Sequence, residues 1–185
     1  MAKFEISEAI TGAAEGLYAN DPADTGGETW AGISRNNWPK WLGWTIIDDI
    51  KKKYGKTAAI INKYGRANRD LNCLRLNFYK ENFWDVNKLD QIKDQQLADS
   101  VYDFGVNSGT GRAAKFLQQA VSKFSRVTID GQIGPQTLSA VNAVPADKLH
   151  AEYNRLRQEF YISIAKGSKV KFLKSWLSRL HPYKH

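Results

Sequence analysis

Hydrophobic positions recur at helical spacing along most of the chain, which predicts a mainly α-helical protein. In the first such segment, over residues 3–15, the apolar positions are Ile6, Ile10, Ala13 and Leu17, and Gly16 is suited to end it. A helical region is expected to resume near residue 46, with breaks at Gly55 and Gly65. Further helices are expected over residues 74–86, 94–107, 111–124, 135–143, 147–165 and 169–180, with Pro135 in a first turn.

Helical spacing is lost in the stretch EGLYANDPADTGGETWAGIS, residues 15–34. Gly26 and Gly27 form a turn signal, and residues 28–33 read as a short strand. We therefore expect a helical body with one small β-hairpin or loop excursion after the first helix.

Charge and residue counts narrow the possible chemistry. The net charge of +8 favours an anionic partner such as nucleic acid, anionic lipid or an acidic cell-wall polymer. A Cys/His hydrolase would need Cys73, which we expect to be an inert buried thiol between Leu71 and Leu76. Three histidines and the lack of an H-E-x-x-H motif argue against a zinc amidase, so we expect no metal and no organic cofactor.

The acidic stretch offers a pair of carboxylates suited to glycoside hydrolysis. Glu15 falls at the C-terminal end of the first predicted helix, where the helix dipole favours the protonated form that a general acid needs. Asp24 falls in the loop, where water and backbone N–H groups favour the ionised form. Thr29 could orient a water, and Tyr18 and Trp30 offer flat faces to sugar rings. An ordinary solvated turn is the plain alternative, and a Ca²⁺ loop fits the spacing poorly.

The same stretch resembles the signature of glycoside hydrolase family 108, the lysozyme-like N-acetylmuramidases, which runs E-G-G-Y-x-N-D-P-x-D-x-G-G-x-T-x-x-G-I. The resemblance continues through FYKENFWDV, YDFGVNSGTGRAAKFLQQAV, DGQIGPQTL and FLKSWLSRL, so it spans nearly the whole chain. It implies a mainly α, lysozyme-like α+β fold. Leu17 stands where the family has a second glycine, and Thr25 stands where proline is frequent.

The resemblance also implies roles for particular residues. Glu15 matches the general acid, and the order Glu15, Asp24, Thr29 is similar to that of phage-type lysozymes, with an Asp-to-Thr gap one residue shorter. Whether Asp24 or Thr29 positions the water stays open. The side chains expected to bind substrate are Tyr18, Asn20, Trp30, Tyr102 and Asn107.

The C-terminal half resembles the predicted peptidoglycan-binding region of this family. With no linker near residues 87–95, we expect a single domain over 1–185. In it, a catalytic part (1–92) and a helical part (93–185) would pack as one body.

The expected activity is that of a bacteriolytic, prophage-type endolysin. It would cleave the β-1,4 bond between N-acetylmuramic acid and N-acetylglucosamine. Peptidoglycan is the expected partner of a monomer that binds no nucleic acid and does not insert stably into membranes.

Glu5 and Glu8 interrupt the apolar N-terminal segment, so we expect no signal peptide. The protein would be made in the cytoplasm and reach the periplasm or wall through a holin-like or other route.

Two alternatives stay open at this point. One is a non-catalytic, basic cell-wall-binding module, in which Trp38, Trp41 and Trp44 form a stacking platform, although their spacing favours a core-facing stripe. The other is a chitinase-like or chitosanase-like hydrolase on the same fold.

Overall fold

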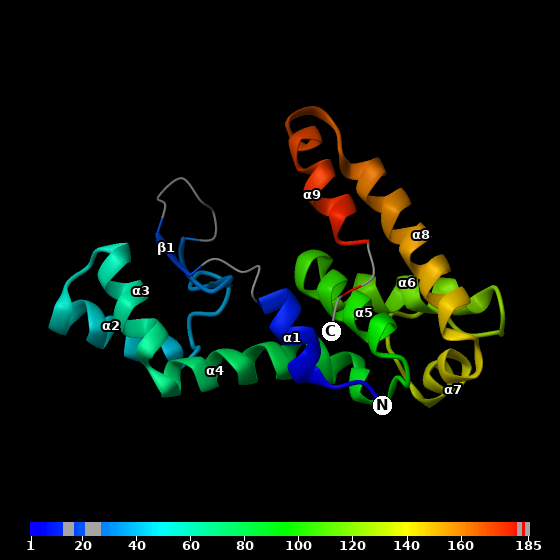
Figure 1. Ribbon diagram of the computed structural model, residues 1–185, viewed down its shortest axis with the longest axis horizontal. Helices are drawn as coiled ribbons and strands as arrows, with labels where there is room; N and C mark the ends of the chain where they lie inside the picture. Colours follow the sequence, from blue (N-terminus) through cyan, green and yellow to red (C-terminus); the bar gives the residue numbers. More distant parts are fainter. Residues whose placement is uncertain (13–16, 21–26, 181–182, 184–185) are drawn as a thin grey trace. The chain divides into compact units, whose positions relative to one another are not determined.

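The computed structural model describes residues 1–12, 17–20, 27–180 and 183 (Figure 1). The chain forms two compact units. We call Thr11–Lys80 the sheet unit, and Met1–Ile10 together with Glu81–His185 the helical unit. The boundary at residue 80 differs from the one that we expected near residue 92, and the packing of both parts as one body stays a prediction.

The sheet unit contains a small antiparallel sheet in the order β1-β2-β3. Its strands are β1 (Tyr18–Asn20), β2 (Glu28–Trp30) and β3 (Ile33–Ser34). Tyr18 pairs with Trp30, and Asn20 pairs with Glu28. Between β2 and β3, Ala31 and Gly32 take positive φ angles of 46° and 80°, which turn the chain tightly. The predicted β excursion in a mainly helical protein is confirmed.

Three helices complete the sheet unit: α2 (Gly43–Tyr54), α3 (Ala58–Ala67) and α4 (Arg69–Tyr79). Thr57 and Asn68 cap the N-termini of α3 and α4 by accepting hydrogen bonds from Ile60 N and Leu71 N. Gly65 was expected to break a helix, but it lies inside α3. A Cβ there would come within 2.3 Å of the Trp30 ring, so the absence of a side chain lets this ring pack against the helix.

Helix α4 corrects the expectation that Cys73 is buried. Leu71 and Phe78, seven residues apart, are buried on one face of the helix. Cys73 and Leu76 lie on other faces, and both are exposed, with Leu76 at 37%. The predicted burial of Cys73 was therefore wrong, because the helix buries only a narrow stripe. The chain then continues as a π-helix (Lys80–Trp84) and 3₁₀ turns (Asp85–Asn87 and Leu89–Gln91).

The tryptophans at positions 38, 41 and 44 form part of an aromatic cluster in the sheet unit. Trp44 is buried, and its ring meets that of Trp41 edge-on at 5.2 Å between centroids. Trp38 packs against Phe78 at 4.9 Å but remains 41% exposed. The core-facing interpretation therefore holds for Trp44, whereas Trp38 keeps an open surface.

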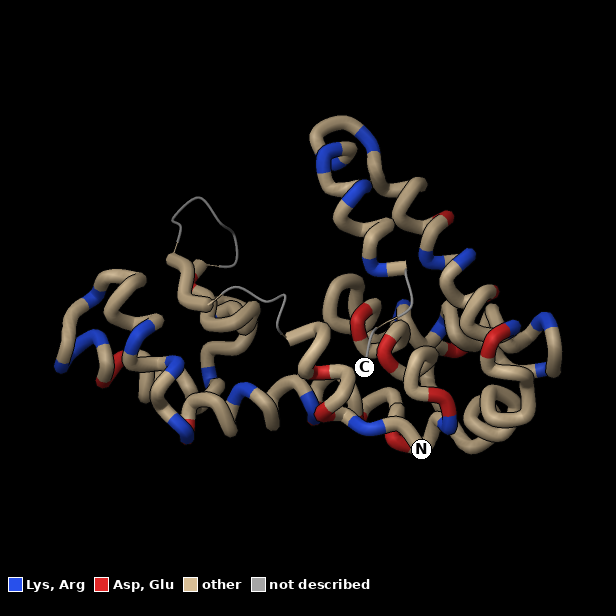
Figure 2. Tube along the Cα trace, viewed as in Figure 1, with Lys and Arg blue, Asp and Glu red and all other residues tan. Residues whose placement is uncertain are grey.

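The helical unit is built around α5 (Gln95–Ser108), which has an almost continuous buried run from Leu97 to Gly105. Around it lie α1 (Phe4–Thr11), α6 (Thr110–Ser122), α7 (Pro135–Ala143), α8 (Ala146–Ile164), a 3₁₀ helix η5 (Gly167–Phe172) and α9 (Leu173–Ser178). Pro135 opens α7 as predicted. Basic residues are spread over both units (Figure 2). Among the described helices, none is long and apolar enough to span a bilayer.

Helix α1 buries a face that hydrophobicity did not predict. Ile6 and Ile10 are only partly buried, whereas Phe4, Ser7 and Glu8 are buried. Ser7 donates a hydrogen bond to Asp99 at 2.5 Å, and the Tyr102 hydroxyl donates to Glu8. The stripe was misplaced because these polar side chains find partners on α5, which makes their burial acceptable.

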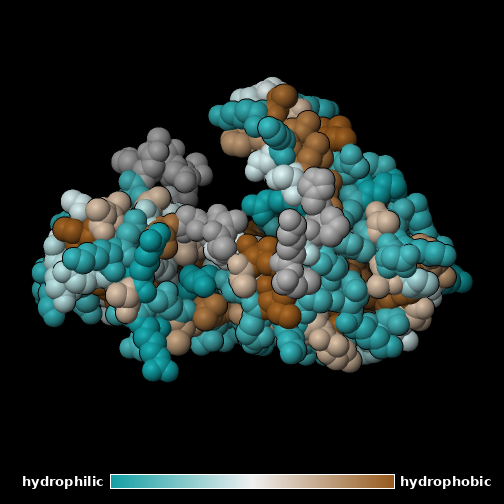
Figure 3. Space-filling view, in the orientation of Figure 1, coloured by the Kyte–Doolittle hydropathy of each residue, from teal (hydrophilic) through white to brown (hydrophobic). Residues whose placement is uncertain are grey.

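Helices α8 and α9 pack on each other as a hairpin. The Tyr161 and Trp176 rings stack with centroids 5.9 Å apart. Farther along, Ile162, Val170 and Phe172 are about half exposed, and hydrophobic side chains are visible there in Figure 3. Neither η5 nor α9 contains a buried residue, so other contacts must hold this segment to the unit.

One such contact is a buried ion-pair group centred on Asp103 of α5. The carboxylate accepts hydrogen bonds from Arg157 of α8 at 2.6 Å and from Arg179 at 2.5 Å. The Arg157 side chain is 0% exposed and that of Asp103 is 3% exposed. A charge buried so completely requires an opposite charge, so Asp103 fixes α8 and the chain after α9 to α5.

Asp103→Asn should lower the free energy of unfolding by about 3–5 kcal/mol, because it leaves a buried guanidinium without its counter-charge. Urea denaturation measures this change. Glu159→Gln is the matched control, since it removes an arginine partner at a site that is 61% exposed and should cost about 1 kcal/mol or less. Equal losses of unfolding free energy in the two variants would show that Asp103 stabilises the helical unit no more than an exposed ion pair does.

His150 of α8 provides a pH-dependent contact in the same unit. Its Nε2 lies 2.7 Å from Ser100 Oγ and 3.2 Å from Asn154 Nδ2. Burial lowers the pKa of His150 below its ordinary value of 6.5; Asp94 opposes this shift and Arg157 adds to it. The folded protein therefore holds the imidazole in its neutral form.

Stability should consequently fall as the pH drops below about 6.5. The unfolded chain then takes up a proton that the buried ring does not, which favours unfolding. The stability that comes from burying His150 in its neutral form is fully present above the pKa of the ring in the unfolded chain. It is lost as the pH falls through the lower pKa of the ring in the folded protein. Unfolding free energies between about pH 5 and 8 test this. His150→Gln should flatten the slope, and an unchanged slope would refute the assignment.

Candidate functional site

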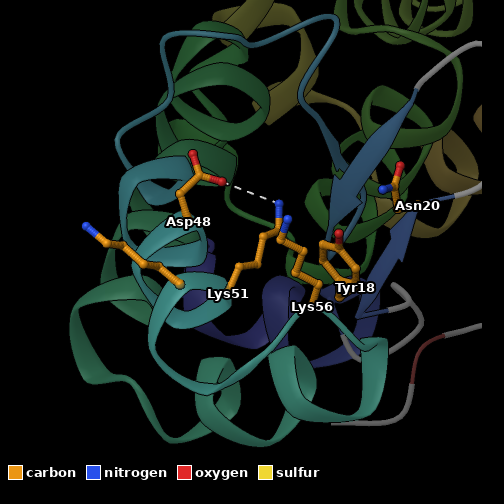
Figure 4. A pocket seen from close by; sticks show the side chains of 6 residues that line it. Tyr18, Asn20, Asp48, Lys51 and Lys56 are labelled. Atoms are coloured by element: carbon orange, nitrogen blue, oxygen red, sulfur yellow. Dashed lines mark hydrogen bonds and ion pairs between the residues drawn. The ribbon is translucent and has the colours of Figure 1, made fainter.

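The sheet unit carries a pocket of about 470 Å³ beside β1 and α2 (Figure 4). It is lined by Tyr18, Asn20, Asp48, Lys51, Lys52 and Lys56. Two of the side chains predicted to bind substrate, Tyr18 and Asn20, thus line one pocket. Three of the six lining residues are lysines, which makes the pocket wall cationic.

A charged network stands behind this pocket, and Glu28 of β2 is at its centre. The Glu28 side chain is 11% exposed and forms ion pairs with Arg35 at 2.8 Å and with Lys51. Asp48 receives two hydrogen bonds from the Arg35 guanidinium, at 2.7 and 3.0 Å, and lies 3.3 Å from Lys51 Nζ. This paired hydrogen bond lowers the pKa of Asp48 below its ordinary value. Two carboxylates and two cations therefore lock β2 to α2.

Sequence reasoning missed Glu28, because it selected only Glu15 and Asp24 as functional acids. The alternation of β2 carries a usable signal. Glu28 and Trp30 are two residues apart and so share a face of the strand, and Trp30 is a core residue. A carboxylate on the face of a buried tryptophan needs a cationic partner, and Arg35 follows shortly after in the sequence.

Tyr18 joins the network to the pocket. Its backbone N donates to Asn62 Oδ1 at 2.9 Å, and Lys51 Nζ lies 5.6 Å from its ring centroid. Burial, followed by a hydrogen bond with Glu28, raises the pKa of the Tyr18 hydroxyl above its ordinary value. The hydroxyl is therefore neutral at physiological pH, and because its single proton is engaged with Glu28, its oxygen is left as an acceptor for a ligand.

The ligand-facing donors of the pocket are the remaining polar side chains. Asn20 is exposed at the end of β1. Lys52 and Lys56 are exposed and form no ion pair with any residue that the structure describes. By contrast, Lys51 is neutralised by Glu28 and Asp48. The pocket can therefore offer one amide and two ammonium groups to a polar or anionic ligand.

The other predicted site residues differ in position. Glu15 and Asp24 lie outside the described residues. Thr29 is half-buried in β2, and its hydroxyl lies 3.5 Å from the Ala19 carbonyl oxygen. Trp30 is 1% exposed, so it has no open face for a sugar ring and acts as a core residue instead.

Tyr102 and Asn107 belong to α5 of the helical unit. Tyr102 is 0% exposed and packs against Phe4 and Trp84 at 5.8 Å, which corrects its expected role in lining a cleft. Asn107 is exposed, and its amide donates to the Asp103 carbonyl at 2.7 Å and to the Asp103 carboxylate at 3.2 Å. It therefore retains an open surface while supporting the buried ion pairs. Within the described ranges, no three acidic, histidine or cysteine side chains gather as a metal site would require.

Glu28→Gln should lower the free energy of unfolding by about 1.5–3 kcal/mol, the range typical of hydrogen bonds to charged groups. The neutral amide cannot balance Arg35 and Lys51, which are both partly buried. Urea denaturation followed by tryptophan fluorescence measures the change. Asp49→Asn, at an exposed position of α2, is the matched control and should be nearly neutral. A loss no larger than that of the control would show that the network is not needed.

Comparison with known proteins identifies the family to which the chain belongs. The family model of glycosyl hydrolase 108 matches residues 9–109, and one described as "Predicted Peptidoglycan domain" matches residues 112–181. The solved structure of Brucella abortus SagA is similar, with a TM-score of 0.63 and 26% sequence identity over 96% of this chain and 88% of that one. No curated protein matches significantly. The chain belongs to the glycosyl hydrolase 108 family, and it is a glycoside hydrolase that carries a predicted peptidoglycan domain.

Proposed function

We propose that the protein hydrolyses peptidoglycan at the β-1,4 bond between N-acetylmuramic acid and N-acetylglucosamine. The observation that carries the proposal is the family match over residues 9–109, which includes both candidate carboxylates and the sheet. The predicted peptidoglycan domain over residues 112–181 supports the same polymer as substrate. The place of action that follows from this substrate is the periplasm or the cell wall.

In this proposal Glu15 is the general acid. It donates its proton to the glycosidic oxygen while the bond from that oxygen to the anomeric carbon breaks, and positive charge develops on the sugar. Water adds to the anomeric carbon and gives up a proton. Asp24, together with Thr29, either activates this water or steadies the positive charge. Thr29 lies next to Glu28 in β2, so the charged network behind the sheet supports its position.

The pocket beside β1 is suited to binding the glycan next to the reacting bond. The Asn20 amide can both donate to and accept from an acetamido group, and the Tyr18 hydroxyl oxygen can accept a hydrogen bond from its N–H. Lys52 and Lys56 attract the carboxylates of the wall polymer, an attraction that salt should weaken. We retain Tyr18 and Asn20 as substrate-binding residues, whereas the buried Trp30 supports the sheet.

Glu15→Gln should reduce the hydrolysis of purified sacculi by about a hundredfold or more, because the amide N–H is not acidic enough to protonate the leaving oxygen. Loss of turbidity and mass analysis of the released muropeptides measure the activity. New reducing ends on N-acetylmuramic acid identify the bond that is cleaved. Glu5→Gln, on the exposed side of α1, is the matched control and should keep full activity.

Two further measurements separate the competing functions. Sacculus binding by Glu15→Gln, with an unchanged circular dichroism spectrum, shows that the variant is folded. Wild-type activity in Glu15→Gln would instead favour a different catalytic group, and no activity in any form would favour a wall-binding module. Faster cleavage of chitin than of sacculi would point to the chitinase-like alternative.

A further inference from the structure

The helical unit contains a second pocket, of about 620 Å³, that the proposed chemistry does not use. One wall is the surface of α6, with Arg112, Lys115, Phe116 and Gln119. The other wall is the loop of residues 130–132, which belongs to the DGQIGPQTL motif. All these residues fall within the segment that matches the predicted peptidoglycan domain.

A single buried side chain holds the loop in place. Gln118 is 1% exposed, and its Oε1 accepts a hydrogen bond from Gly131 N at 2.8 Å. Its Nε2 donates to Asp130 Oδ1 at 2.8 Å and to the Gln132 carbonyl at 3.0 Å. Three consecutive loop residues are thus fixed to α6 from behind. Such a loop loses little conformational freedom when a ligand binds.

Gly131 lets the loop approach the helix closely. Its φ angle is +83°, and a Cβ there would lie 3.2 Å from the Lys115 side chain and 3.3 Å from the Gly111 carbonyl oxygen. A larger residue would strain the backbone at this positive φ and would crowd the Lys115 side chain and the Gly111 carbonyl. The spacing between the two walls therefore depends on this glycine.

The pocket carries two cations that form no ion pair with any described residue. They are Arg112 and Lys115, and both are exposed. Arg112 is held in position by a hydrogen bond to the Ser108 carbonyl at 2.9 Å and by its place 4.7 Å over the Phe160 ring. Lys115 projects from the next turn of the same helix. Together they present a fixed guanidinium and an adjacent ammonium.

The loop of residues 130–132 supplies a carboxylate, Asp130, which is a hydrogen-bond acceptor. Asp130 receives hydrogen bonds from Gln118 and from Gln132 N, and these hold its pKa below the ordinary value. Its Oδ1 accepts both of these bonds, so its second oxygen remains as an acceptor for ligand N–H groups. The Gln119 and Gln132 side chains are exposed beside it and can pair with amides.

Phe116 is the aromatic side chain among the residues that line this pocket. Phe116 is half-buried, and its ring is engaged by Phe104 at 5.2 Å and by Phe160 at 5.8 Å. Arg112 covers the Phe160 ring. Sugar recognition by stacking favours a fully open aromatic face, whereas Phe116 is half-buried against these two rings. The polar groups instead match a chain of amides that ends in, or carries, carboxylates.

We propose that this pocket binds the stem peptide of peptidoglycan, with a peptide carboxylate at Arg112 and Lys115 and peptide amides at Asp130, Gln119 and Gln132. The identity of the polymer rests on the proposed function. The pocket itself lies in the helical unit, whereas Glu15 falls in the segment 11–80. Binding here and hydrolysis can therefore be measured and lost independently.

The test uses the full chain with Glu15→Gln, so that the wall is not degraded during the experiment. The probes are purified sacculi, a soluble disaccharide-tetrapeptide, and a chito-oligosaccharide without peptide. In this background, Lys115→Glu should weaken binding of the disaccharide-tetrapeptide by about tenfold or more, because it turns an attraction into a repulsion. Lys148→Glu, at an exposed position of α8, makes the same charge change and should leave this binding nearly unchanged.

Lys115→Arg keeps the charge and should preserve binding, which separates recognition from a folding defect. The proposal is overturned if Lys115→Glu and Lys148→Glu weaken binding equally, since the attraction would then be a general effect of net charge. It is also overturned if the peptide-free oligosaccharide competes as well as the disaccharide-tetrapeptide.

Failure of the proposed hydrolysis is recognised separately. It appears as intact sacculi after treatment with the unmodified chain, while peptide binding that depends on Lys115 persists. If the unmodified chain hydrolyses sacculi but peptide binding does not depend on Lys115, only the second site is refuted and the proposed hydrolysis stands.

Discussion

The helical unit depends on the neutralisation of one buried arginine. Arg157 is completely inaccessible on α8, and Asp103 on α5 supplies the negative charge that makes its burial tolerable. The same carboxylate also holds Arg179, which follows a helix without buried residues of its own. Burial of apolar surface gives this unit its core, but the charged group decides which segments lie against α5. The sheet unit repeats this principle with Glu28, which holds Arg35 and Lys51 against β2.

Hydrophobic spacing located the helices between residues 94 and 165 to within two residues. It misplaced α4, which runs from Arg69 to Tyr79 and not from residue 74 to 86, and it did not predict which face of α1 is buried. The segment 135–143 was predicted with the observed limits, and the segment around 95–108 was displaced by one residue. The face of α1 was misjudged because Ser7 and Glu8 are buried through hydrogen bonds. Gly65 was misjudged because its role is to make room for a ring from a distant strand. Pairing and steric fit between distant residues are invisible to a pattern of single positions.

The candidate site likewise contains some residues that the sequence could identify and others that only the fold reveals. Tyr18 and Asn20 could be chosen from the sequence because they lie within the acidic stretch of residues 15–34, and they do line one pocket. Trp30 was chosen because an aromatic ring can stack on a sugar. This choice ignored that an aromatic ring in a small three-stranded sheet is also well suited to the hydrophobic core, where Trp30 lies. Glu28 was passed over because its importance arises from Lys51, more than twenty residues later. Motifs identify reacting groups, whereas the groups that position them depend on the fold.

The position of Gln118 has a consequence for how this protein family can diversify. This side chain shapes the loop 130–132 from the buried side, while Arg112 and Lys115 face outward from the same helix. Framework and contact surface thus reside on separate positions of one helix. Exchanges at the outward positions can therefore alter the groups that the pocket presents to a ligand without disturbing the loop, so the contact surface can vary while the scaffold is kept.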